Sequence, residues 1–132
     1  MKIQALELMI STGLLILIWL IQILHYPSFR FIDQRDFPRF AKFHGSRISM
    51  IVIPLMFMEL GLALFFCNPV ILTLVTGIWL STFLLQVPCH NLLGLKHDPL
   101  IIDRLITTNW VRTTLWTIKY VILTGWFFAS WA

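Results

Sequence analysis

Four long stretches of the chain carry almost no charge, and these stretches limit the folds that the chain can adopt. They cover residues 8–24, 48–66, 69–88 and 113–132. The second contains one charged residue, Glu59, the fourth contains one, Lys119, and the other two contain none. Each stretch approaches the roughly 20 apolar residues with which a helix crosses a bilayer. Because 58% of all residues are hydrophobic and only 12% are charged, we predict an integral membrane protein and exclude a soluble enzyme, a disordered tail and a disulfide scaffold.

The uncharged stretches predict an all-α fold in which four transmembrane helices form one bundle. In hydrocarbon every backbone N–H and C=O needs a partner within its own segment, which favours helices. The predicted spans are residues 6–26, 47–66, 70–88 and 112–131. The second and third spans are joined by a short turn at residues 67–69, Cys-Asn-Pro. A chain of 132 residues is the usual size of one domain, so residues 1–132 are expected to form a single unit.

Each of the two longer loops is predicted to contain a short helix that lies in the membrane interface. In residues 36–48, three phenylalanines recur at helical spacing and the basic residues lie on another face, which is typical of an interfacial helix. Residues 98–112 have a similar apolar side. Both segments begin with an aspartate, Asp36 or Asp98, and a proline follows within two residues. An aspartate cap and an early proline both favour a helix start.

The basic residues are distributed unequally between the two ends of the predicted bundle. Residues 27–47 contain five Lys and Arg residues and residues 89–112 contain three, whereas the other end has only Lys2. The positive-inside rule then places both long loops in the cytoplasm and both termini outside the cell membrane. Anionic lipid head groups account for the net charge of +4, so we predict no nucleic-acid partner. The oligomeric state is left open.

The two halves of the chain resemble each other, which suggests an internal duplication of a two-helix unit. Four identical ionisable residues match when the halves are aligned 65 positions apart, and His44 then matches Asn109. The halves would lie in parallel, related by an axis along the membrane normal. The identical pairs are His25 and His90, Asp33 and Asp98, Arg39 and Arg104, and Arg47 and Arg112.

Six polar residues are expected near the end of the bundle where the spans meet the basic loops. His25, His44, His90 and Asn109 lie at one membrane level, and Arg47 and Arg112 lie one turn deeper. A four-helix bundle would bring these residues together, so that the three histidines could bind a metal ion or two of them could ligate a haem iron. The histidine spacing does not choose between these cofactors, because no two histidines of the set lie within one helical turn. The alternative is that these side chains only contact lipid phosphates and water.

Two charged residues, Glu59 and Lys119, lie inside predicted spans, where an unpaired charge is costly. Glu59 is 12 residues from the start of its span at residue 47, or about 18 Å along a helix, which is too deep for its carboxylate to reach the interface. We expect Glu59 to face the bundle interior, where it either contacts Lys119 or is neutral. As an alternative to pairing, Glu59 and Lys119 each line a polar cavity as ligand-binding residues. Lys119 could instead extend its ammonium to the interface.

Three short strings resemble motifs of a large group of small bacterial membrane proteins that is similar to the anthrone oxygenase-like family. They are residues 24–29 (Leu-His-Tyr-Pro-Ser-Phe), 86–91 (Gln-Val-Pro-Cys-His-Asn) and 108–113 (Thr-Asn-Trp-Val-Arg-Thr). The resemblance covers most of the chain and implies a four-helix membrane fold and oxidation of polycyclic phenols without an established metal. Through His25 before Tyr26-Pro27, the chain also resembles the four-helix haem-binding protoporphyrinogen oxidases, which implies a haem, although the rest of that pattern has no clear match.

Two functions follow as hypotheses. The first is a pocket for a small lipophilic molecule at the cytoplasmic interface, lined by the six polar residues with Glu59 deeper. If the protein is an enzyme, oxidoreduction of a phenolic or quinol-like substrate is the expected class, with a histidine taking the proton and the arginines holding the anion. The second is a non-catalytic membrane subunit or small transporter, in which Glu59 and Lys119 form a structural or proton-handling pair.

Overall fold

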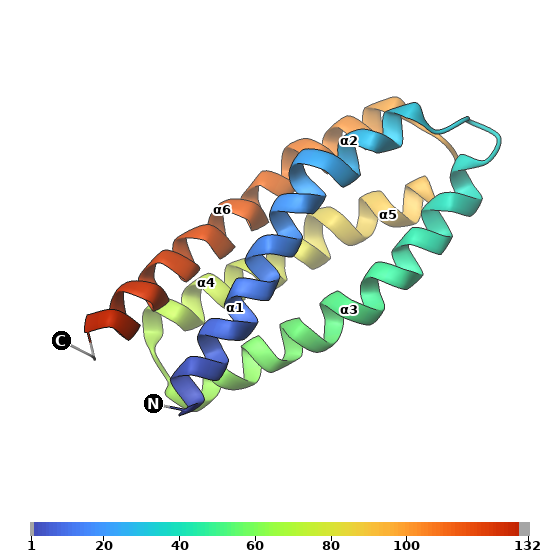
Figure 1. The fold of residues 1–132 in the computed structure, drawn as a ribbon. Helices are drawn as coiled ribbons and strands as arrows, with labels where there is room; N and C mark the ends of the chain where they lie inside the picture. Colours follow the sequence, from blue (N-terminus) through green and yellow to red (C-terminus); the bar gives the residue numbers. More distant parts are fainter. Residues whose placement is uncertain (1, 130–132) are drawn as a thin grey trace.

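The computed structural model describes residues 2–129, and every regular element among them is helical. The helices form four antiparallel rods in one elongated bundle (Figure 1). The first rod comprises α1 (Lys2–Leu20), η1 (Ile21–His25), α2 (Tyr26–Ser28) and η2 (Phe29–Phe31), the second is α3 (Phe37–Phe66), the third comprises α4 (Pro69–Ser81), η3 (Thr82–Gln86) and α5 (Val87–Leu93), and the fourth is α6 (Pro99–Ala129). The all-α prediction is confirmed, and positions 130 and 131 of the predicted fourth span lie outside the described residues.

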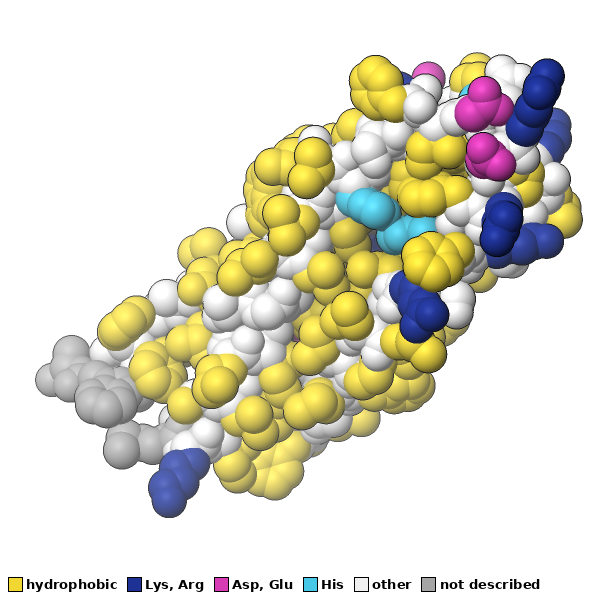
Figure 2. Space-filling model, turned by 45° about the vertical axis from the view of Figure 1, so that its right-hand side comes forward, with side chains coloured by type: hydrophobic (Ala, Val, Ile, Leu, Met, Phe, Trp, Pro, Cys, Tyr) yellow, Lys and Arg dark blue, Asp and Glu magenta, His cyan; other side chains and the backbone are white. Residues whose placement is uncertain are grey.

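The surface of the bundle is compatible with a membrane protein. Within residues 2–129, three stretches are long and apolar enough to cross a bilayer, namely Lys2–Phe31, Phe37–Phe66 and Pro69–Leu93. The fourth rod, α6, carries Arg112 and Lys119 in its apolar half and is not among them. Apolar side chains cover the visible flank, and most charged side chains gather at the end that carries the long loops (Figure 2). Large apolar side chains that face outward along the flank, such as Met9 and Leu84, are those that lipid would cover.

The rods pack in a square, so that each contacts two neighbours. The first rod packs on α3 and α6, and the third rod packs on the same two helices. The first and third rods therefore lie across the bundle from each other and run in the same direction, as do α3 and α6 (Figure 1). This is the arrangement that a twofold axis along the bundle would give. The internal duplication remains a prediction.

The first and the third rod each contain a widened π-helical turn that ends two residues before a proline. The N–H of Tyr26 bonds to the carbonyl of Ile21, five residues earlier, and Val87 bonds to Thr82 in the same way. A proline has no N–H and its ring clashes with the carbonyl four residues before it. A widened turn ahead of Pro27 and of the corresponding proline at position 88 accommodates both effects.

The turn between the second and third rods is formed as predicted. Cys67 ends α3 in the left-handed conformation, with φ of 49°, and its N–H bonds to the carbonyl of Ala63. Asn68 then caps α4, because its side-chain oxygen accepts hydrogen bonds from the N–H groups of Val70 and Ile71 at 3.0 and 3.2 Å. Pro69 occupies the first position of α4, where its missing N–H leaves no bond unmade.

The prediction of two separate interfacial helices is wrong. Residues 37–47 are the first turns of α3 and residues 99–111 are the first turns of α6, and both helices continue into the apolar segments without a break. Neither junction contains a proline, so the ladder of backbone hydrogen bonds is not interrupted. Asp98 accepts a hydrogen bond from the N–H of Leu100 as expected of a cap, whereas the side chain of Asp36 makes no capping bond.

Candidate functional site

The three histidines of the predicted site lie together at the loop end of the bundle. Nε2 of His25 is 2.7 Å from Nδ1 of His44, so one imidazole donates a hydrogen bond and the other accepts it. The ring of His44 lies 6.1 Å, centre to centre, from the ring of His90. The widened turn η1 ends at His25, so the local geometry before Pro27 sets the direction from which His25 meets α3.

The arrangement gives the metal hypothesis for His25, His44 and His90 no support. His25 and His44 each use one ring nitrogen for the hydrogen bond between them. Nε2 of His90 is hydrogen-bonded to the hydroxyl of Tyr26 at 2.9 Å. Across residues 2–129, no group of three His, Cys, Asp or Glu side chains has an arrangement that could hold a metal ion.

Arg112 is the most unusual side chain near this cluster. It is 5% exposed, and its Nε has no hydrogen-bond partner. Its guanidinium lies close enough to the Tyr26 hydroxyl to interact with it electrostatically, and it lies 5.0 Å from the ring of Trp116. Arg112 forms no ion pair with a carboxylate of the described chain, where the salt bridges join other residues. A buried cation without a carboxylate partner is costly, so the site is suited to receive an anion.

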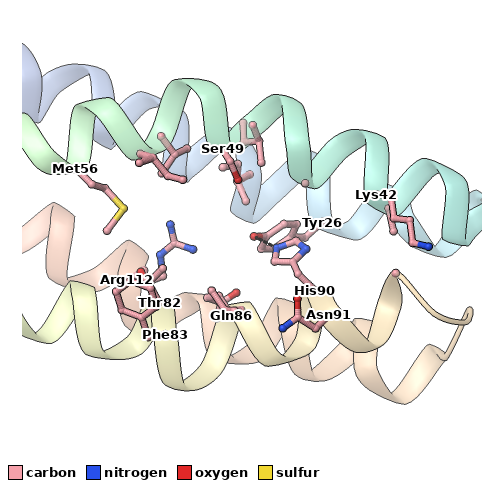
Figure 3. A pocket seen from close by; sticks show the side chains of 18 of the residues that line it. Tyr26, Lys42, Ser49, Met56, Thr82, Phe83, Gln86, His90, Asn91 and Arg112 are labelled. Atoms are coloured by element: carbon pink, nitrogen blue, oxygen red, sulfur yellow. Dashed lines mark hydrogen bonds between the residues drawn. The ribbon is translucent and has the colours of Figure 1, made fainter.

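Arg112 points into a cavity of about 520 Å³ between α3 and the third rod (Figure 3). Its walls are mostly apolar, with Met56, Phe57, Trp79 and Phe83 toward the middle of the bundle. The hydrogen-bonded Tyr26 and His90, together with Gln86, provide polar groups beside Arg112. The cavity is large enough for a small amphipathic molecule, because ligand pockets measure roughly 300–1,000 Å³.

Gln86 adds an unpaired acceptor to the wall of the cavity. The side chain is 1% exposed, and its amide nitrogen donates to the hydroxyl of Thr108 at 3.0 Å. Its amide oxygen is buried without a partner, and buried acceptors are usually satisfied. The widened turn η3 ends at Gln86, two residues before the proline at position 88. The cavity therefore presents a donor, Arg112, and an acceptor, Gln86, to one ligand head group.

Two of the predicted site residues lie elsewhere. Arg47 is exposed on α3 and places its guanidinium 5.4 Å from the ring of Phe43, so it does not line the cavity with Arg112. Asn109 is fully buried and donates to the side-chain oxygen of Gln22 at 2.9 Å. Gln22 also accepts from the hydroxyl of Thr113 at 3.1 Å, so Asn109 belongs to a structural contact between the first and fourth rods. His25 and His44 lie next to the cavity but are not part of its wall.

Glu59 and Lys119 form an ion pair in the middle of the bundle. Nζ of Lys119 is 2.9 Å from Oε1 of Glu59, and both side chains are 1% exposed. The same ammonium donates to the hydroxyl of Ser11 at 3.0 Å. The indole N–H of Trp116 donates to both carboxylate oxygens of Glu59, at 3.0 and 3.1 Å. Lys119 therefore does not extend to the interface, and the pairing alternative for Glu59 is the one observed.

Several residues near the cavity and around the Glu59–Lys119 ion pair were not predicted to contribute to a site. Their spacing in the sequence nevertheless indicates that they are buried. Glu7, Ser11, Leu14, Ile18 and Gln22 are all buried on the first rod, and they recur every three or four residues. Such spacing places side chains on one face of a helix. On α6 the buried face includes Asn109, Arg112, Trp116 and Lys119. The periodicity therefore indicates that these polar residues face the interior of the bundle, but the sequence does not identify the residues that they contact.

No protein-family model, curated protein or solved structure shows significant similarity to the chain. The function is therefore argued from the geometry of the cavity and of its charged residues.

Proposed function

We propose that this protein binds a small amphipathic molecule whose anionic head group pairs with Arg112 and whose apolar part fills the rest of the cavity. The observation that carries the proposal is the guanidinium of Arg112, which is 5% exposed, has an unpartnered Nε and points into a largely apolar cavity. An anion accepting hydrogen bonds from Arg112 would compensate the buried charge. The apolar wall around Met56 and Phe83 suits an aliphatic or aromatic tail.

The Tyr26–His90 pair and Gln86 refine the chemistry of the head group. Gln86 has a free acceptor oxygen in the cavity wall, so a ligand hydroxyl can donate to it. The Tyr26 hydroxyl and His90 imidazole, 2.9 Å apart, can exchange a proton with a group bound at Arg112. Phenols and quinols, which carry a hydroxyl that ionises to an oxyanion, belong to the class that these groups would accept. In the enzymatic form of the proposal such a substrate is oxidised, and an external electron acceptor takes the electrons that it loses.

The same proposal places all four rods in the membrane, with α6 as the fourth span. Buried side chains of α6 form the ion pair with α3 and the contacts to the first rod, so α6 is an integral part of the bundle. The five and three basic residues of the two long loops support a cytoplasmic position for the loop end. The cavity would then open between α3 and the third rod in the cytoplasmic half of the cell membrane.

The test compares a charged and a neutral ligand of equal length. Octane-1-sulfonate and octan-1-ol would be titrated into the purified protein in lipid nanodiscs, with binding followed by calorimetry. We expect Arg112→Gln to weaken octane-1-sulfonate about 10–100-fold, since hydrogen bonds to charged groups contribute about 1.5–3 kcal/mol. Binding of octan-1-ol should change little, which also shows that the variant is folded.

Arg47→Gln is the matched control, because Arg47 is exposed and lies outside the cavity. It should leave the binding of both ligands unchanged, and Arg112→Lys should recover part of the sulfonate affinity. If Arg112→Gln and Arg47→Gln weakened the sulfonate equally, the charge would act only through the general surface potential and the proposed site would be refuted.

A further inference from the structure

A second cavity lies at the opposite end of the bundle and has a carboxylate in its wall. It measures about 180 Å³ and is lined by residues near both termini and the turn between the second and third rods, including Gln4, Glu7, Asn68 and Trp126. Glu7 is 8% exposed, and its carboxylate accepts no hydrogen bond from the side chains described. Its charged neighbours are Lys119 and Glu59. Glu7 therefore connects the ion pair in the middle of the bundle with the second cavity.

Trp116 contacts both Glu59 of the buried ion pair and Arg112 of the ligand cavity. One face of its ring lies 5.0 Å from the guanidinium carbon of Arg112, which is a cation–π contact. Its indole N–H donates to both oxygens of Glu59. A single buried side chain, 2% exposed, thus contacts the cation that faces the ligand and the anion that faces Lys119. A change of charge at Arg112 is transmitted over one side chain to Glu59.

An anion gives Arg112 the contacting partner that it lacks, but over the whole interior the formal charges of the buried side chains balance only while the ligand cavity holds no anion. Arg112 and Lys119 are the buried cations, and Glu7 and Glu59 are the buried carboxylates among residues 2–129. An anion bound at Arg112 leaves the interior with one excess negative charge. In a medium of low dielectric constant such an excess is expensive, and uptake of a proton removes it.

Glu7 is the carboxylate best placed to take that proton. Glu59 accepts hydrogen bonds from Trp116 and Lys119, so its carboxylate oxygens are already engaged. Glu7 has no such donor, and it borders the second cavity. Other titratable groups near the ligand are Tyr26 and His90, which face Arg112 from the first and third rods, Lys42 in the cavity wall, and the pair His25 and His44 beside His90. His90 is therefore the competing acceptor that the experiment must separate from Glu7.

We propose that the protein binds its anionic ligand together with one proton, which enters from the opposite end of the bundle and is held at Glu7. This inference rests on the proposed ligand site at Arg112. It assigns the second cavity a function as a proton entry site. It also couples the binding of the anion to the binding of a proton, as a proton-linked carrier of lipophilic anions requires. The proton comes from a hydronium ion or a buffer acid in the solvent: the donor's bond to the proton breaks, the donor keeps the electron pair, and one O–H bond forms at a carboxylate oxygen of Glu7.

The experiment measures proton uptake with a ligand that cannot itself take up a proton. Octane-1-sulfonate is a strong acid anion, so any proton taken up on binding belongs to the protein. Calorimetric titrations at pH 7 in phosphate and in Tris, whose ionisation enthalpies differ, give the number of protons per bound anion. We expect about one proton for the wild type, and an affinity that falls about tenfold per pH unit once the free protein is deprotonated.

Glu7→Gln and His90→Gln distinguish the two acceptors. In Glu7→Gln the amide mimics the neutral acid, so the sulfonate should bind with no proton uptake and with little pH dependence. His90→Gln should still take up about one proton. Sulfonate binding to the wild type without proton uptake would overturn this inference and leave the proposed ligand site standing. Uptake that persists in Glu7→Gln and disappears in His90→Gln would also overturn it, whereas the absence of sulfonate binding would refute the ligand site itself.

Discussion

Lys119→Met should destabilise the bundle far more than an average substitution, because it leaves the buried carboxylate of Glu59 without the cation that it pairs with. Methionine has a similar length and shape, so the packing around position 119 is largely kept. The lost contacts are the ion pair to Glu59 at 2.9 Å and the hydrogen bond to Ser11 at 3.0 Å, all within side chains that are nearly inaccessible. Removing one partner of such a buried pair costs about 3–5 kcal/mol, or roughly two to four powers of ten in the folding equilibrium.

The free energy of unfolding can be measured by titrating sodium dodecyl sulfate into the protein in dodecyl maltoside micelles, with the far-ultraviolet circular dichroism as the signal. Lys2→Met is the matched control, because it removes the same charge from an exposed position and should change stability by less than about 0.5 kcal/mol. The double variant Lys119→Met with Glu59→Gln should recover most of the loss, since neither side chain of the former pair is then charged.

Two results would refute this reasoning. The first is equal stability of Lys119→Met and the Lys2→Met control, which would mean that the ammonium does not stabilise Glu59 in the folded protein. Alternatively, the double variant could lose the sum of both single losses, which would mean that Glu59 and Lys119 act independently and are not a coupled pair.

Three further predictions concern the ends of the bundle. A membrane-impermeant maleimide added outside intact cells should label the exposed Cys67 and spare the buried Cys89, and labelling of Cys67 only after the cells are opened would reverse the topology. Asn68→Ala should lower the stability by about 1 kcal/mol, seen as a lower unfolding midpoint, because two N–H groups of α4 lose their acceptor; no change would show that the cap is dispensable. The hydrogen bond from Lys96 lowers the pKa of Asp98, so this pair stabilises the fold above the ordinary carboxyl range and the effect is lost as the pH falls through the lowered pKa. Lys96→Met should raise the pKa of Asp98 toward its ordinary value in an NMR titration, and an unchanged value would exclude this contact as the cause.

Local sequence features fixed the helical rods and the turn between the second and third. Long uncharged segments predict helices because the backbone must satisfy itself in hydrocarbon, and Asn68-Pro69 predicts a helix start because the side chain and the fixed φ angle suit that position. Such signals lie within a few residues of the structure that they determine. The prediction of separate interfacial helices was wrong because it did not consider where such a helix would end. Residues 36–48 have helical periodicity, but no residue at their C-terminal side terminates a helix.

The candidate site was predictable only in part. The depth of each polar residue followed from its position along a span, so the three histidines were expected at one level and lie together. Their number suggested a metal site, but the direction of each ring depends on the widened turns and on neighbours such as Tyr26. Depth along a helix is a local property, whereas the direction of a side chain around the helix axis is meaningful only once the neighbouring helices are placed.

The two arginines Arg47 and Arg112 show the difference between what the sequence determines and what the tertiary structure decides. The sequence alone placed both arginines at the same depth and in matching positions of the two halves. The packing of the rods turned Arg112 into the cavity and left Arg47 on the surface. Lys119 likewise meets Ser11 across 108 positions of the chain. Composition and periodicity determine which segments enter the membrane, because burial in lipid acts on each segment separately. Which charges meet depends on the rotation and pairing of helices, which only contacts between distant segments can set.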